Sequence, residues 1–196
     1  RRLGWRSLRR RLEGLVRLEW RDSFVVGALF FLIGHGTLHW AEQTLSSGLA
    51  ALLVATEPLW IAALLAIFEG TPLTSRTLAG LLLGLLGVAL LGRSDVLVLG
   101  RQAWLGGLAV LIGAASWGGG VVYSRRATLP ADPILRTGTT LLAGAVLLLL
   151  AAVGTGEVQQ IQAPSSRALA ALAYLIVFGS VIAFSSYFWL LERYSP

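Results

Sequence analysis

The sequence predicts an all-α integral membrane protein with six transmembrane helices. Of its 196 residues, 56% are hydrophobic and only 13% are charged, and the mean hydropathy is +0.74. Several apolar runs also approach the roughly 20 residues that an α-helix needs to cross a hydrocarbon core. Soluble domains rarely combine so few charges with so much apolar sequence.

The charged residues favour a membrane role over nucleic-acid binding. All 16 basic residues are arginine, and the formal net charge is +6. Most of these arginines flank apolar runs, where helix orientation in a membrane explains them better than a nucleic-acid partner does. The chain has no cysteine, which excludes disulfide and thiolate chemistry. It also has no methionine, and we therefore expect an internal piece of a longer protein.

Residues 1–22 form a basic segment that we expect in the cytoplasm. Eight arginines lie there, with leucines and a tryptophan interleaved. The pattern fits either a short amphipathic helix on an anionic membrane face or a plain loop before the first span.

Six predicted spans follow this segment. They cover about residues 23–41, 48–68, 76–92, 103–123, 134–153 and 168–190. If residue 1 lies inside, thirteen arginines fall on the cytoplasmic side of these spans and three on the other side. Since positive residues concentrate in cytoplasmic links, both ends of the chain are predicted to be cytoplasmic.

The first span carries the two histidines of the chain, His35 and His39. They lie four residues apart and so share a helix face with Phe31 and Glu42. They could bind solute or relay protons, because histidine titrates near neutral pH. They could equally hydrogen-bond to neighbouring helices. A metal pair needs a third ligand that the sequence does not supply, so no metal is expected.

The second span places Glu57 and Pro58 near its middle. An ionised carboxylate is costly there, so it usually faces a polar interior, pairs with another group or takes up a proton. Proline removes the amide that would bond the carbonyl of Val54, and this predicts a helix that is bent or opened at this point. Glu57 is thus a candidate for exchanging a proton with solute, and the alternative is a protonated or paired packing residue.

Aromatic side chains offer further candidate contacts. Trp60 and Trp117 could stack on a solute from facing helices, by a cation–π interaction if the solute is cationic. The alternative is that they are lipid-facing or core aromatics. Tyr123 lies near the end of a span and is predicted to belong to the aromatic belt at the membrane interface.

The third span has glycines at helical spacing, at Gly80, Gly84 and Gly87. Glycine allows two helices to approach closely, so this face is predicted to pack against another helix. That helix could belong to the same chain or to a second copy in a homodimer.

A faint repeat relates the first span to the last. Gly34 and Gly179 each lie in an apolar run with small or polar neighbours, followed by an aromatic residue and a serine-containing end. Five spans fit into the 145 residues that separate these glycines. An odd number of spans turns the second copy over in the membrane, as in the inverted repeats of secondary transporters.

Six segments, taken in their order and spacing, resemble the EamA-type branch of the drug/metabolite transporter superfamily. They are WAEQTLSSGLAALLVATEPLW (40–60), EGTPLTSR (69–76), AGLLLGLLGVALLG (79–92), SWGGGVVYSRRATLP (116–130), LLAGAVLLL (141–149) and FGSVIAFSSYFWLLERYSP (178–196). The resemblance covers essentially the whole chain beyond residue 22. One departure is the link after Glu69, where the family more often has glycine before glutamate.

The resemblance implies a ten-helix bundle of two inverted five-helix repeats. Residues 23–92 would then be three spans of the first repeat, and residues 103–196 would begin the second. It implies a multi-pass secondary transporter of a bacterial inner membrane, which exports small metabolites or drug-like solutes by alternating access. Glu57 and His35 would then couple transport to protons. Because each half would lack spans, residues 1–196 alone are expected to insert but not to transport.

Two other functions compete with transport. An intramembrane enzyme could use His35, His39 and Glu57 as an acid–base or metal-binding set, and a structural membrane subunit would need no polar site at all. The nucleotide fingerprint GxxxxGK[ST] does not occur in the sequence, so no ATP-driven engine and no cofactor are expected.

Overall fold

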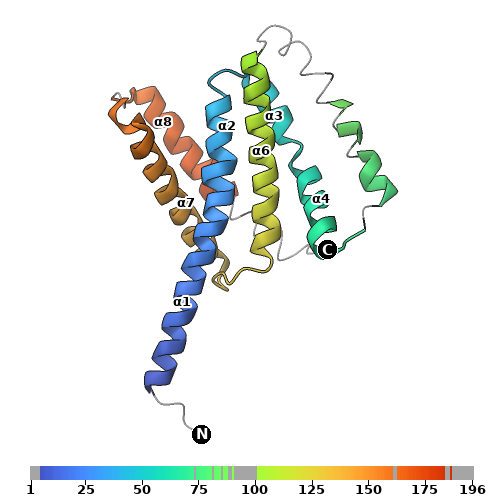
Figure 1. The fold of residues 1–196 in the computed structure, drawn as a ribbon. Coiled ribbons are helices and arrows are strands. Elements are labelled where there is room, and N and C mark those ends of the chain that lie inside the picture. The colour runs from blue at the N-terminus through green and yellow to red at the C-terminus, as the bar shows by residue number, and fades with distance from the viewer. Residues whose placement is uncertain are drawn as a thin grey trace.

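The computed structural model describes residues 5–72, 74–80, 82–84, 86–87, 90, 101–160, 163–183 and 186. Every named element in these ranges is helical (Figure 1), which confirms the predicted fold class. The elements are α1 Trp5–Gly27, η1 Ala28–His35, α2 Gly36–Ala41, α3 Ser47–Val54, α4 Glu57–Glu69, α6 Arg101–Ser124, α7 Pro133–Thr155, η2 Glu157–Gln160, α8 Ser166–Tyr174 and η3 Leu175–Ile182. Of these, η1 and η3 are π-helical and η2 is a 3-10 turn.

Four helical runs among the described residues are long and apolar enough to cross a membrane. They are Val16–Ala41, Ser47–Glu69, Trp104–Ser124 and Pro133–Thr155. These runs correspond to four of the six predicted spans. The predicted spans 76–92 and 168–190 both include residues outside the described ranges, and the part of the latter that is described contributes to a shorter apolar helix, Ser166–Ser180.

The first helix begins earlier than the sequence predicted. Elements α1, η1 and α2 follow one another without a break from Trp5 to Ala41, and the basic part of α1 extends below the bundle in Figure 1. No proline interrupts this stretch, and its arginines, leucines and glutamates favour helix. The plain loop considered for the basic segment is therefore wrong from Trp5 onward.

The second span is broken where Glu57 and Pro58 predicted it. Helix α3 ends at Val54, α4 begins at Glu57, and Pro58 is the second residue of α4. At the break the carbonyl of Leu53 accepts two hydrogen bonds from the buried Thr56, one from its hydroxyl at 2.6 Å and one from its backbone N–H at 3.1 Å. The predicted interruption is thus confirmed.

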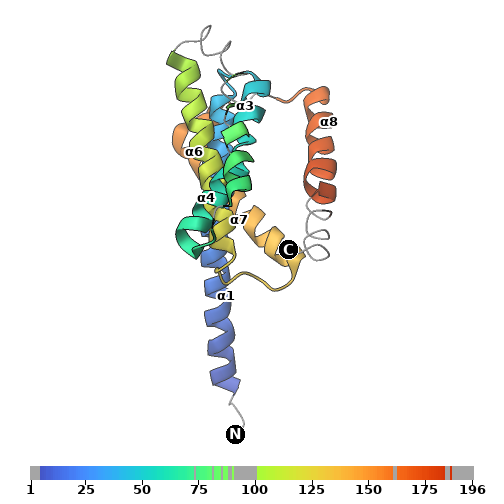
Figure 2. The ribbon, with the colours of Figure 1, turned by 90° about the vertical axis from the view of Figure 1, so that its right-hand side faces the viewer.

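Helix α6 forms the centre of the bundle. It packs against α1, η1, α2, α3 and α4, while α7 packs on the other side of α1 and η1 (Figure 1). Two glycine crossings allow this close approach. A Cβ atom on Gly27 would lie 2.8 Å from the backbone nitrogen of Gly144, and one on Gly113 would lie 2.8 Å from the carbonyl oxygen of Gly34. Figure 2 shows α8 standing apart from the other helices.

Ion pairs show which links share an end of the bundle. The Glu69 carboxylate at the end of α4 lies 3.5 Å from Arg125 and 4.0 Å from Arg126. Arg126 also donates to the carbonyl of Phe68 at 3.0 Å. The two links around Glu69 and Arg125, which were predicted to lie on one side of the membrane, therefore lie at the same end.

The predicted packing stripe, Gly80, Gly84 and Gly87, is open in the described chain. A Cβ atom on any of these glycines would meet no atom within 4 Å. The spacing therefore has no partner helix among the described residues, and its role remains a prediction. A helix from outside these ranges or from a second copy would have to supply the contact.

This difference between glycines gives a matched pair of substitutions. We expect Gly113→Ala to destabilise the folded protein by about 1–3 kcal/mol, since the added methyl group would overlap Thr37 and the Gly34 carbonyl. Gly80→Ala makes the same chemical change in open space and should be neutral or slightly stabilising. The melting temperature in detergent measures both. Equal melting temperatures for the two variants would contradict the crossing described between Gly34 of η1 and Gly113 of α6.

Candidate functional site

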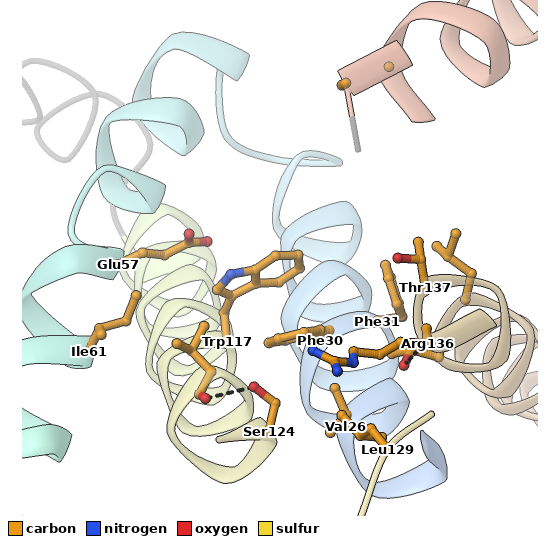
Figure 3. Close-up of a pocket in the computed structure, with 15 residues that line it drawn as sticks. Val26, Phe30, Phe31, Glu57, Ile61, Trp117, Ser124, Leu129, Arg136 and Thr137 are labelled. Atoms are coloured by element: carbon orange, nitrogen blue, oxygen red, sulfur yellow. Dashed lines mark hydrogen bonds between the residues drawn. The ribbon is translucent and has the colours of Figure 1, made fainter. Parts of the chain in front are cut away.

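A cavity of about 590 Å³ lies among α1, η1, α4, α6 and α7, and η3 reaches one side of it (Figure 3). Its volume is within the range of about 300–1,000 Å³ that is typical of small-molecule sites. Most of the lining is apolar, with a few polar groups. The lining residues are Val26, Phe30, Phe31, Glu57, Ile61, Trp117, Val121, Ser124, Leu129, Arg136, Thr137, Thr140, Leu141, Gly179 and Ala183.

Glu57 reaches the cavity because the second span is broken. As the first residue of α4 it is half-buried, and it is the only carboxylate in the described lining. Figure 3 shows its side chain directed toward Trp117. No hydrogen-bond or ion-pair partner of this carboxylate occurs among the described residues. Two of the predicted pathway residues, Glu57 and Trp117, therefore meet in one cavity.

An aromatic wall faces the cavity from η1 and α6. The rings of Phe30 and Trp117 stack with centroids 4.4 Å apart, and Phe31 meets Trp117 edge-on at 6.2 Å. Gly120 permits this packing, since a Cβ atom there would lie 2.5 Å from the ring of Phe30. Both phenylalanines belong to the π-helical segment, a rare geometry that is often found at functional sites.

The two histidines lie outside the cavity lining. His35 contacts the rings of Trp117 and Phe31 at centroid distances of 5.2 and 5.5 Å, so it lies next to the aromatic wall. The His39 side chain is 71% exposed, and its Nδ1 lies 3.6 Å from the carboxylate of Glu42. The described residues contain no group of three side chains that could hold a metal ion. A transport role for either histidine remains a prediction.

Trp60 and Pro58 also lie outside the lining. Trp60 is exposed, and a Cβ atom on Gly118 would lie 3.1–3.2 Å from its Cβ and its backbone, so glycine at this position allows α4 and α6 to approach closely. Pro58 is exposed and contributes through the helix break. Of the two predicted stacking residues, the structure places only Trp117 in the cavity.

Arg136 lines the cavity, although the sequence analysis used it only to orient the helices. It is the fourth residue of α7, and its Nε donates to the carbonyl of the buried Pro130 at 3.0 Å. The sequence did offer one signal for a place at the cavity. Arg136 lies at the start of a span, and ionisable residues within membrane helices usually face the bundle interior.

Asp22 was also missed, because it falls at the end of the basic segment. It is 2% exposed. Its Oδ1 accepts hydrogen bonds from the Tyr123 hydroxyl at 3.0 Å and from Arg21 Nε at 2.9 Å, and its Oδ2 accepts one from the Thr128 backbone at 2.6 Å. Tyr123 therefore binds Asp22 at the end of its span, and its place in the aromatic belt at the membrane interface stays a prediction. These contacts tie α1 to the end of α6 beside the cavity.

Comparison with known proteins identifies the family of the chain. The sequence pattern of the EamA-like transporter family matches residues 4–93 and 104–196. The chain belongs to this family. Its first match includes much of the arginine-rich part of α1, and its second begins within α6. This family is described as one of transporters.

Named relatives agree with the EamA family. The chain is 34% identical over 176 residues to an "uncharacterized inner membrane transporter YedA" of Escherichia coli. These aligned residues cover 89% of this chain and 56% of YedA. It is 30% identical over 175 residues to a chloroplastic WAT1-related protein of Arabidopsis thaliana, which covers 83% of this chain and 41% of that protein. A Bacillus subtilis protein, "uncharacterized transporter YoaV", is 28% identical over 136 residues, or 69% of this chain and 47% of YoaV.

The chain thus spans about half the length of the curated relatives it matches. No solved structure matches it. Its apolar helices and its similarity to YedA place it in the inner membrane, as the sequence analysis predicted.

Proposed function

We propose that the protein is a secondary carrier that moves a small solute outward through the cavity between η1, α4, α6 and α7. The observation that carries this proposal is the half-buried Glu57 at a broken helix, which has no partner among the described residues and faces an apolar cavity of small-molecule size. Broken helices and ionisable groups near mid-membrane are common features of transporter binding sites.

The repeat predicted from Gly34 and Gly179 gives further support. Each glycine lies in a π-helical segment of eight residues, η1 and η3, within its apolar helix. Both segments contribute to the same cavity, η1 through its phenylalanines and η3 through Gly179. Equivalent elements of two inverted repeats that meet at one site are the architecture in which rocking of the repeats produces alternating access.

Glu57 is the proposed site of proton exchange. The carboxylate has no described partner that would hold it in one charge state, so it is free to exchange a proton when the cavity opens to water on either side. Coupling then follows if solute binding and protonation at Glu57 influence each other. His35 lies outside the cavity lining with its ring centroid 5.2 Å from that of Trp117, and it would act on Glu57 through the Trp117 ring.

Flux measurements test the carrier function. The complete protein, reconstituted in vesicles, is expected to accumulate a solute against its gradient when a proton gradient is imposed. A transport screen in a deletion strain would supply candidate solutes. If no solute from that screen moved faster than in protein-free vesicles, a carrier role would be contradicted and a structural subunit favoured.

A further inference from the structure

We propose that the carried solute bears a carboxylate that binds the guanidinium of Arg136, with its apolar body against the Phe30–Trp117 pair. This inference rests on the proposed carrier function and names the class of solute. The first observation is the placement of Arg136 itself, half-buried at the cavity with its Nε anchored on the Pro130 carbonyl. Figure 3 shows its side chain extended from α7 toward Phe30.

The anchored guanidinium still has free donors. Its two terminal nitrogens have no hydrogen-bond or ion-pair partner among the residues that the structure describes. A guanidinium held by one nitrogen presents the others in a fixed planar fork, which matches the two oxygens of a carboxylate. The Arg136 side chain is thus preorganised for an oxyanion.

The other polar groups of the lining do not compete for that role. The hydroxyls of Ser124, Thr137 and Thr140 donate to backbone carbonyls of their own helices at 2.8 Å. They therefore offer lone pairs to the cavity and not protons. In the described lining, only the Trp117 indole remains as another N–H donor, and it carries no charge.

Glu57 does not neutralise Arg136. Helix α4 packs on α6, α6 on η1, and η1 on α7, so these two residues reach the cavity from the two outer helices of this series. In Figure 3 the rings of Trp117 and Phe30 lie between them. A solute anion is therefore attracted to the Arg136 side. A single guanidinium balances a carboxylate but would leave a doubly charged phosphate group partly uncompensated.

Helix orientation alone does not explain the position of Arg136. Arginines at the cytoplasmic end of a span satisfy the positive-inside rule wherever their side chains point. Arg125 and Arg126, at the same end of the bundle, are exposed and pair with Glu69. Arg136 instead lines the cavity with no carboxylate partner in the part of the chain that the structure describes, which is the feature that a binding role requires.

Two isosteric probes test this subsite on the purified complete protein by calorimetric titration. 3-Phenylpropionate carries a carboxylate, and 3-phenylpropanamide replaces it with a neutral amide. We expect the carboxylate to bind about tenfold or more tightly, because a hydrogen bond to a charged group is worth at least that factor. Arg136→Gln should remove this preference while leaving the affinity for the amide within about twofold, which also shows that the variant is folded.

Further variants sharpen the result. Arg136→Lys keeps the charge without the planar fork and should retain only part of the preference. Arg167→Gln removes an exposed arginine of α8 outside the cavity lining and should change nothing. The subsite is overturned if wild type binds neither probe, if it binds both equally, or if Arg136→Gln keeps the preference. Phenyl phosphate serves as a third probe, which carries a phosphate group in place of the carboxylate. Tighter binding of phenyl phosphate than of 3-phenylpropionate would overturn the choice of a carboxylate.

Flux of the same probes separates this inference from the carrier function. Transport of both probes at equal rates and affinities would overturn the carboxylate subsite alone. Binding with the carboxylate preference, but with no flux of any solute in vesicles, would overturn the carrier function alone.

Discussion

Glu57→Gln is expected to abolish proton-driven accumulation of solute while leaving the protein folded in the membrane. Glutamine has the size of glutamate but cannot bind or release a proton. Because Glu57 has no described hydrogen-bond or ion-pair partner, the change leaves no group unpaired and should not cost stability. The amide also removes a charge from the cavity, so solute binding itself can survive.

Solute flux into vesicles across a range of pH measures this effect. Under a proton gradient, we expect accumulation of solute by the variant to fall to the level of protein-free vesicles. Without a gradient, the variant should still exchange solute across the membrane, at a rate that does not depend on pH. Glu157→Gln makes the same chemical change at an exposed position in η2 and should transport like wild type. Full accumulation by Glu57→Gln with an unchanged pH dependence would reduce Glu57 to a packing residue.

Asp22→Ala is expected to cause a large loss of stability, about 2–4 kcal/mol, because it removes a buried carboxylate and leaves the donors around it without their acceptor. The carboxylate accepts from the Tyr123 hydroxyl, the Thr128 backbone and Arg21. Water cannot easily replace it, since Asp22 is 2% exposed. The loss should separate α1 from the end of α6 and loosen the adjacent side of the cavity.

Melting temperatures in detergent measure this loss, and two further variants divide it. Tyr123→Phe removes one of the three donors and should cost about 1 kcal/mol. Arg21→Gln changes a side chain that is 64% exposed and should cost little, since solvent screens its pairing with Asp22. If Asp22→Ala melted within a degree of wild type, the hydrogen bonds of Asp22 would not hold α1 in place.

The sequence was sufficient for features that depend on local chemistry. Hydropathy located four spans that the structure describes in full, because each apolar run must satisfy its own backbone hydrogen bonds in lipid. The missing amide of Pro58 located the break between α3 and α4. The resemblance to the EamA family was confirmed by the family match.

Features that depend on packing between helices could not be read in the same way. The helical spacing of glycines marked Gly80 as a packing position. The tight crossings occur instead at glycines such as Gly27 and Gly113, which have no second glycine three or four residues away. A one-dimensional pattern does not say which face meets a partner. Asp22 was missed and Arg136 was counted only among the arginines that flank spans, because only the fold shows that one is buried and the other lines a cavity.

Access to the cavity from both sides of the membrane is the central claim of alternating access, and a single cysteine tests it most directly. Val121 lines the cavity on α6, and Val146 is exposed on α7 outside it. We expect Val121→Cys, in a cysteine-free complete protein, to react with a membrane-impermeant maleimide in right-side-out and in inverted vesicles alike. Val146→Cys should react in neither, since lipid excludes the reagent. Reaction of Val121→Cys from one side only would contradict the carrier account.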